Sequence, residues 1–212
     1  MVRSSSRGKS AKVVVKRGVL NQARWEQILQ SAAVEFYEKG YKAARLQDIA
    51  ARVGLLTGSL YYYIESKEQL LFFLVESTYR KRLEADTARQ DGGGRDSVDR
   101  LREFIRAQVQ VLEESPAAST LIVERDRKFL SAEHRAQIET LRAELSGKLE
   151  AILEDGIKAG DFDPTVDVGV ATRTLFALVN TTPEWMQELP GQPWDEISDW
   201  YVRLFVSALN ME

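Results

Sequence analysis

Apolar residues recur three or four positions apart along nearly the whole chain from Trp25 onward, which is the spacing of one face of an α-helix. The first stripe ends at Gly40 and predicts one helix: Trp25, Ile28, Leu29, Ala32, Ala33, Phe36 and Tyr37. Later stripes predict helices at about 67–89, 97–114, 116–128, 131–159, 165–181 and 194–210, with Gly160 and five prolines between them. No segment shows a convincing strand pattern, so we expect an all-α fold.

Residues 45–71 contain two short amphipathic helices joined at a glycine. The first has one apolar face and stops at Gly54, which adopts a positive φ without steric cost: Leu46, Ile49, Ala50 and Val53 form this face. In the second helix, 57–64, Leu60 and Ile64 lie one turn apart and face inward. Such a pair of helices is typical of a unit that enters a DNA groove.

The outward side chains of the second helix suit contact with DNA. Thr57, Gly58 and Ser59 are compact enough to let the start of the helix approach base edges. The three tyrosines at 61–63 cannot all be core. Because a phenol hydrogen-bonds a phosphate oxygen while its ring packs on a neighbouring helix, we expect at least one of them to face DNA.

The helix that follows begins with a capping pattern. Ser66 is expected at the N-cap with Gln69 three residues later, which together satisfy two free backbone N–H groups. Lys67 then lies beside the helix terminus, close to where phosphates would be.

The segment from about Arg24 to Leu71 resembles the DNA-binding domain of TetR-family repressors. The matching residues are Phe36, Gly40, Tyr41, Asp48, Ile49, Ala50, Gly54, Gly58, Leu60, Tyr61, Tyr62, Ser66, Lys67 and Leu70. The resemblance implies a three-helix helix-turn-helix domain at 21–70 and a helical ligand-binding and dimerisation domain at 71–212. It also implies that Lys67 contacts a phosphate. Our candidate DNA-binding residues are Arg45, Thr57, Gly58, Ser59, Tyr61, Tyr62 and Lys67.

Two positions depart from the family pattern, which has serine or threonine caps before both helices of the motif. Here Arg45 precedes the first helix and Leu56 precedes the second. Loss of such a cap costs about 1 kcal/mol of helix stability. We expect Arg45 to compensate by binding a phosphate, whereas Thr57 either caps its helix or contacts DNA.

Composition excludes several classes of protein. The chain has 212 residues, no cysteine and one histidine, without a nucleophile-elbow pattern or a glycine-rich phosphate loop, so neither catalytic residues nor a metal or cofactor is expected. No apolar run reaches about 18 residues, and the basic N-terminus lacks an apolar segment after it. We therefore expect a cytoplasmic protein without membrane association.

The net charge of −3 hides a strong asymmetry. Residues 1–25 carry seven bases and no acid, whereas the remaining 187 residues carry 22 bases and 32 acids. A basic end on an acidic body fits a protein whose partner is double-stranded DNA, because only the local field meets the phosphates. We interpret 1–20 as a disordered basic arm, which either follows the DNA or serves as a solubilising tail.

The last two predicted helices indicate a homodimer. One carries a continuous stripe: Ile197, Trp200, Tyr201, Leu204, Phe205, Ala208 and Leu209. The other is apolar nearly all round: Val166, Val168, Val170, Ala171, Leu175, Phe176, Ala177, Leu178 and Val179. Such a helix must be covered on both sides, either within one subunit or by a twofold-related copy. A dimer would set two recognition helices about 34 Å apart, or a multiple of that, on a near-palindromic operator.

The helices within 97–182 are expected to enclose a small-molecule effector. The candidate ligand-binding residues are Phe104, Leu121, Arg125, Phe129, Leu145, Leu149, Phe176, Asn180 and Trp185. Each has a structural alternative, because Phe and Leu at these spacings also form ordinary core and Arg125 lies in a charged run. His134 is expected on the exposed side of its helix.

Residues 178–180 followed by Trp185 resemble, within the family, regulators of fatty-acid and steroid catabolism that leave DNA on binding an acyl-CoA. Glu184 departs from that pattern and would repel a phosphate-bearing ligand. We interpret the chain as a repressor that a largely apolar effector releases from DNA. Acyl-CoA is one hypothesis for that effector. The rival is a helical protein-interaction scaffold, which gives no reason for Gly54, Ser59, Lys67 and the basic arm.

Overall fold

The computed structural model describes residues 22–90, 96–114, 125–189 and 191–210, and every regular element in those ranges is a helix. In chain order these are α1 (Gln22–Ala43), α2 (Leu46–Arg52), α3 (Thr57–Leu60), α4 (Lys67–Gln90), α5 (Ser97–Glu114), η2 (Arg127–Phe129), α7 (Ala132–Ala159), α8 (Val168–Trp185), η3 (Met186–Glu188) and α9 (Trp194–Leu209). The all-α prediction is confirmed. The predicted arm at 1–20, Leu121 and most of the predicted helix 116–128 lie outside the described residues.

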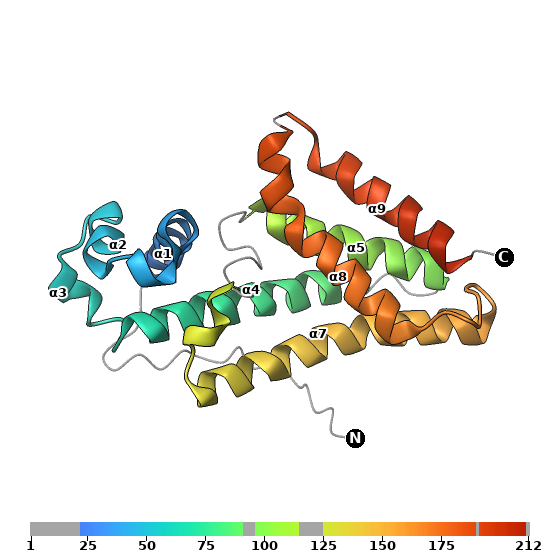
Figure 1. The fold of residues 1–212 in the computed structure, drawn as a ribbon, viewed down its shortest axis with the longest axis horizontal. Helices are drawn as coiled ribbons and strands as arrows, with labels where there is room; N and C mark the ends of the chain where they lie inside the picture. Colours follow the sequence, from blue (N-terminus) through green and yellow to red (C-terminus); the bar gives the residue numbers. More distant parts are fainter. Residues whose placement is uncertain (1–21, 91–95, 115–124, 190, 211–212) are drawn as a thin grey trace, which may run out of the picture.

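Figure 1 shows α1, α2 and α3 gathered at one end of the molecule and α5, α8 and α9 toward the other, with α7 running beside α4 to that other end. We call α5, α7, α8 and α9, together with the C-terminal half of α4, the helical body. Helix α4 runs from one group to the other and packs on α1 as well as on α5 and α7 (Figure 1). Helix α4 is thus one continuous helix shared by the two groups.

Helix α1 buries the stripe that predicted it. Ile28, Ala32 and Phe36 are fully buried, and Gly40 adopts φ 73°, so the helical conformation is interrupted at the predicted end before one more turn completes α1. The Ser31 hydroxyl donates to the Ile49 carbonyl at 3.1 Å. This buried bond fixes α2 against α1.

Helices α2 and α3 meet at Gly54, whose φ is 65°, as the sequence predicts. Leu60 and Ile64 are buried, but α3 ends at Leu60 rather than at 64. The chain continues as hydrogen-bonded turns in which Tyr63 N and Ile64 N both donate to the Leu60 carbonyl, at 2.9 and 3.2 Å. Tyr63 and Ile64 both pack toward the core, which a regular helix disfavours because successive side chains point about 100° apart.

The body helices agree with their predicted ranges except for α8. Helix α7 starts after Ser131, whose hydroxyl accepts from His134 N at 3.1 Å, and ends at Gly160 with φ 82°. Helix α8 starts later than predicted, because Asp167 caps it by accepting from Val170 N at 2.9 Å. It also runs beyond the predicted end at 181, through Pro183 to Trp185.

The prediction that Pro183 interrupts the chain's helices is wrong. A proline in the last turn removes only one backbone hydrogen bond, and tertiary packing here supports the turn. Thr182 and Pro183 are both buried, and the Thr182 hydroxyl lies 2.7 Å from the Tyr201 hydroxyl of α9. Burial against α9 therefore holds the end of α8 in helical form.

Candidate functional site

The candidate recognition surface is the outer side of α3 and the turn after it. Thr57, Gly58 and Ser59 are at least partly accessible, and the side chains of Tyr61 and Tyr62 are 55% and 72% exposed. Buried Leu60 and Ile64 anchor the same segment from beneath. The fold thus presents small polar residues and two phenols from a rigid base, which suits the approach of DNA.

The two family-type caps are missing, as the sequence predicts. Arg45 and Leu56 precede α2 and α3 in extended conformation, and neither makes a side-chain capping bond. The Ser66 cap of α4 is confirmed, since Gln69 N donates to the Ser66 hydroxyl at 3.0 Å and Glu65 N donates to Gln69 Oε1 at 2.7 Å.

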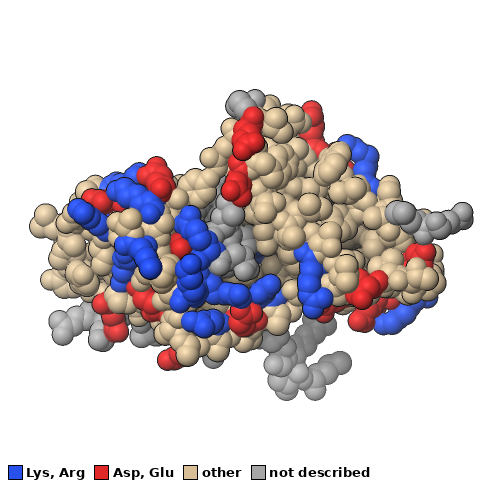
Figure 2. Space-filling model, viewed as in Figure 1, with Lys and Arg blue, Asp and Glu red and all other residues tan. Residues whose placement is uncertain are grey.

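Ion pairs that we did not predict join α1 to α2. Glu35 is fully buried and lies 2.6 Å from Lys39 and 3.5 Å from Arg52, and Lys39 also reaches Asp48 at 3.0 Å. The hydrogen bond from Lys39 holds the pKa of Asp48 below its usual value. On the face shown in Figure 2, Lys and Arg gather over α1 and α2 and near the start of α4, whereas the end formed by α3 is tan. The network therefore orients α2, and with it α3, beside a basic surface.

Lys67 is held by the protein itself. Its ammonium donates to the carbonyls of Ala44, at 2.8 Å, and Lys42, at 3.3 Å, and lies 4.5 Å from the ring centre of Tyr41. Partial burial lowers the pKa of Lys67. The predicted phosphate contact stays a prediction, and the observed bonds join the start of α4 to the end of α1.

Arg125 and Phe129, both predicted to contact a ligand, lie at the junction between α1 and η2, and their ligand contact stays a prediction. The ring of Phe129 stacks on Tyr41 with centroids 4.9 Å apart, and an Arg125 nitrogen donates to the Phe36 carbonyl at 2.6 Å. Buried Asp126 also pairs with Arg125 at 2.9 Å. The chain at 125–129 thus fastens the body to α1.

Replacing Phe129 with leucine should test this junction. Loss of the stacked ring is expected to lower the free energy of unfolding by about 0.5–1.5 kcal/mol beyond the loss of buried area. Urea denaturation followed by circular dichroism measures it, with Phe129→Tyr as the control that keeps the ring. Equal midpoints for the two variants would show that the stack does not stabilise the junction.

The expectation that His134 is exposed is wrong. Its ring stacks on buried Phe72 with centroids 4.0 Å apart, and Nδ1 lies 2.8 Å from a carboxylate oxygen of Glu68. The same carboxylate accepts from Ser131 N at 2.8 Å. The error arose because helical spacing along α7 alone does not reveal that the first turn of α4 covers this position.

The centre of the body holds a polar cluster around Arg82 of α4, which is 1% exposed. Its Nε donates to Gln108 Oε1 of α5 at 2.7 Å, and Nη1 donates to Asn180 Oδ1 of α8 at 3.0 Å. The guanidinium carbon lies 5.4 Å from the ring centre of Phe176. Burial lowers the pKa of Arg82 to about 10, so the group stays charged at neutral pH.

The predicted ligand residues therefore divide into separate groups. Phe176 and Asn180 touch Arg82, and Phe104 meets Phe176 with ring centroids 6.1 Å apart. Leu145 and Leu149 are buried in α7 as ordinary core would be, and Trp185 is half-buried at the end of α8. We did not predict Arg82 or Gln108. Arg82 continues the buried stripe Leu71, Val75 and Tyr79 at helical spacing, and that signal was available.

A second buried charge lies one turn beyond Arg82. Asp86 is 2% exposed and pairs with Lys148 of α7 at 2.8 Å. Together the two positions on α4 connect it by polar contacts to α5, α7 and α8.

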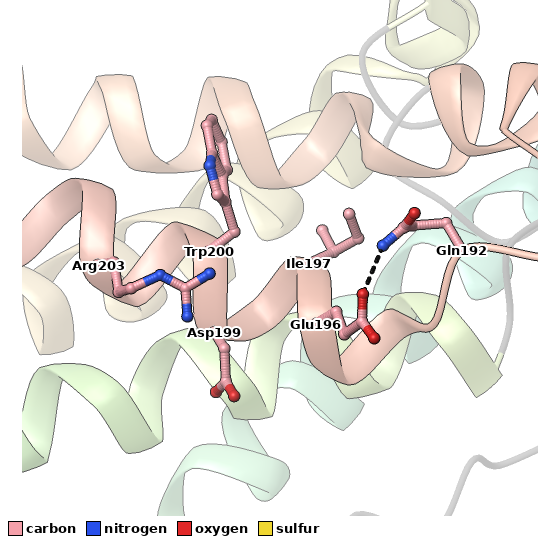
Figure 3. Close-up of a pocket in the computed structure, with 6 residues that line it drawn as sticks. All are labelled: Gln192, Glu196, Ile197, Asp199, Trp200 and Arg203. Carbon is pink, nitrogen blue, oxygen red and sulfur yellow. Dashed lines mark hydrogen bonds between the residues drawn. The ribbon is translucent and has the colours of Figure 1, made fainter.

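Three large apolar side chains are exposed on α8 and α9, among polar and charged neighbours. Trp200 is 50% and Leu204 39% exposed, and Val170 is also exposed. A hollow of about 320 Å³ on α9 is lined by Trp200, Gln192, Glu196, Ile197, Asp199 and Arg203. In Figure 3 the side chain of Asp199 points away from Trp200, and it pairs with Arg106 of α5 at 2.8 Å. An exposed tryptophan within an apolar stripe marks a surface for another protein.

Within the described ranges of the chain, no three acidic, histidine or cysteine side chains gather as metal ligands would. None of the helices there has the length and apolar character needed to span a membrane.

Two family models match the chain. That of the bacterial regulatory proteins, tetR family, covers residues 28–73, and that of the tetracyclin repressor-like C-terminal domain covers 94–209. The transcriptional repressor KstR2 of Mycobacterium tuberculosis is 27% identical over 204 residues, which are 92% of this chain and 96% of that protein.

Solved structures of TetR-family regulators resemble the whole fold. The TetR-family regulator PfmR from Thermus thermophilus superposes with a TM-score of 0.77 at 29% identity, over 87% of this chain and 98% of PfmR. AibR in complex with isovaleryl coenzyme A and operator DNA superposes with a TM-score of 0.74 at 25% identity, over 85% of this chain and 97% of AibR.

Proposed function

The chain belongs to the TetR family of transcriptional regulators, and we propose that it is a repressor that binds a near-palindromic operator as a homodimer and leaves it when an acyl-CoA occupies the helical body. The observation that carries the DNA-binding role is the outer side of α3, where Thr57, Gly58 and Ser59 stand beside two exposed tyrosines over a buried base. Such a protein acts in the cytoplasm, where bacterial DNA is found.

The dimer follows from the exposed apolar side chains of α8 and α9. Two copies that meet through Val170, Trp200 and Leu204 bury apolar surface that one copy leaves in water. Because α4 connects this body to α1–α3, the dimer also sets the distance between the two recognition helices.

The effector class rests on the relatives. AibR was solved with isovaleryl coenzyme A and operator DNA, which makes an acyl thioester the first candidate for this chain. Glu184, which argued against a phosphate-bearing ligand, is exposed at the end of α8, where water screens its charge. An acyl group that enters between α4, α5 and α8 would displace α4 and alter the spacing of the recognition helices.

Selection of bound fragments from genomic DNA at physiological salt, followed by footprinting, tests this function. We expect a protected near-palindrome that an acyl-CoA releases. Binding that appears only at low salt and shows no sequence preference would favour the scaffold alternative.

Tyr62→Phe should separate the tyrosines that face DNA from the one that supports the fold. Removal of the exposed hydroxyl is expected to weaken operator binding by about tenfold if it bonds a phosphate. Tyr63→Phe, at a residue packed toward the core, is the matched control and should bind as the parent does. Fluorescence anisotropy with the selected operator measures both. Equal affinities of the two variants would show that the Tyr62 hydroxyl makes no bond to the operator.

A further inference from the structure

The Arg82 cluster combines a buried cation with partners that another molecule can replace. Gln108 and Asn180 offer neutral amide oxygens to the guanidinium at 2.7 and 3.0 Å. A carboxylate forms shorter, charge-assisted bonds to the same nitrogens and can take two of them at once. The guanidinium is thus able to exchange amide oxygens for an anionic oxygen of a ligand.

We propose that Arg82 is the residue that selects the effector, by binding a carboxylate on the end of the molecule that enters the helical body. The inference rests on the proposed function, since it concerns the same effector site. It narrows the effector class from acyl thioesters in general to those whose acyl chain carries a carboxylate far from the thioester.

The surroundings of Arg82 suit a hydrocarbon chain with such an end. The rings of Phe104 and Phe176 meet edge to face on one side of the cluster, and Phe176 lies over the guanidinium. Phe176 and Asn180 are half-buried, whereas Arg82 and Gln108 are fully buried. Phe176 and Asn180 of α8 are therefore the members of the cluster nearest the solvent, and the cation lies at its inner end.

Occupancy of Arg82 also has a mechanical consequence. The two observed bonds connect α4 to α5 through Gln108 and to α8 through Asn180. A carboxylate that takes the guanidinium from Asn180 breaks the link between α4, which leads to α1–α3, and α8, which bears exposed Val170. Binding of the ligand at Arg82 and loss of the bond between α4 and α8 are then the same event.

Two coenzyme A thioesters that differ at one end provide the test. Adipoyl-CoA ends in a carboxylate where hexanoyl-CoA ends in a methyl group, and the two acyl chains have the same number of carbons. Isothermal titration of the full chain should show adipoyl-CoA bound at least about tenfold more tightly, the effect of one charge-assisted contact. Equal or weaker binding of adipoyl-CoA overturns the inference while leaving the acyl-CoA proposal intact. If neither thioester binds, both the inference and the acyl-CoA proposal are contradicted. If the thioesters bind as expected but the protein does not bind an operator, only the DNA-binding role is contradicted.

Variants distinguish recognition from mere structural support. Arg82→Met should abolish the preference for adipoyl-CoA and leave hexanoyl-CoA binding within about twofold, because only the charge-assisted contact is lost. Asn180→Leu removes the competing acceptor and should keep or increase the preference. Thr181→Ala, at the exposed neighbour of Asn180, is the control and should match the parent. Should Arg82→Met fail to fold, the comparison of parent with Asn180→Leu decides: a preference lost on removal of the amide would overturn the inference.

Discussion

Replacing both Trp200 and Leu204 with glutamate should convert the dimer to a monomer and weaken operator binding by at least about a hundredfold. In a monomer, binding at one half-site no longer raises the effective concentration of a second DNA-binding unit at the other half-site. Both side chains stand half-exposed on one face of α9. Apolar surface that associates in the parent becomes charged, and the twofold axis brings the new carboxylates of the two copies together.

Sedimentation equilibrium measures the oligomeric state, and anisotropy with the selected operator measures affinity. Gln137→Glu, on an exposed turn of α7, controls for the effect of added negative charge on DNA binding. A double variant that remains dimeric would place the interface on another surface. A monomer that binds the operator as tightly as the parent would contradict the two-half-site mechanism.

Local sequence signals predicted most of the helices, because their causes lie within a few residues. Gly54 adopts the positive φ predicted for it, and Gly160 ends α7 between the two helices that it was predicted to separate. Ser66 caps α4 with Gln69, and the missing caps at Arg45 and Leu56 are also observed. Each of these features depends on backbone sterics or on one hydrogen bond between near neighbours.

Contacts between distant segments were not predicted, because periodicity along one helix does not identify its neighbours. Phe129 reads as a lining residue of the body, yet it stacks on Tyr41 of α1. His134 reads as exposed, yet Phe72 and Glu68 of α4 cover it. Pro183 reads as a break, yet burial keeps it inside α8. In each case tertiary packing overrides the local signal.

The Arg82 cluster shows a different reason for failure. An arginine on a helical stripe is normally taken as the end of the buried face, because an unpaired charge in the core is costly. The residues that accept its bonds, Gln108 and Asn180, lie 26 and 98 positions away. Only the assembled body reveals that this position is inside and that its partners meet there.

The tight packing at the end of α7 leads to the second large effect that we expect. Replacing Gly156 with alanine should destabilise the protein by about 1–3 kcal/mol, the usual cost of overpacking a core. A methyl group there would overlap the ring of Phe162 and come within 3.0 Å of the Ser97 Cβ of α5. Phe162 is itself only 2% exposed, so the ring has no free space to enter.

Gly147, also in α7, offers a matched control, because a Cβ built on it meets no atom within 4 Å. Gly147→Ala should stabilise the protein by about 0.5–1 kcal/mol through the higher helix propensity of alanine. The same substitution in the same helix is thus expected to act with opposite sign at the two sites. Midpoints of urea-induced unfolding measure both changes. If Gly156→Ala proved as stable as Gly147→Ala, Phe162 would have to move without cost, and the contact that closes α7 against α5 would be looser than its geometry indicates.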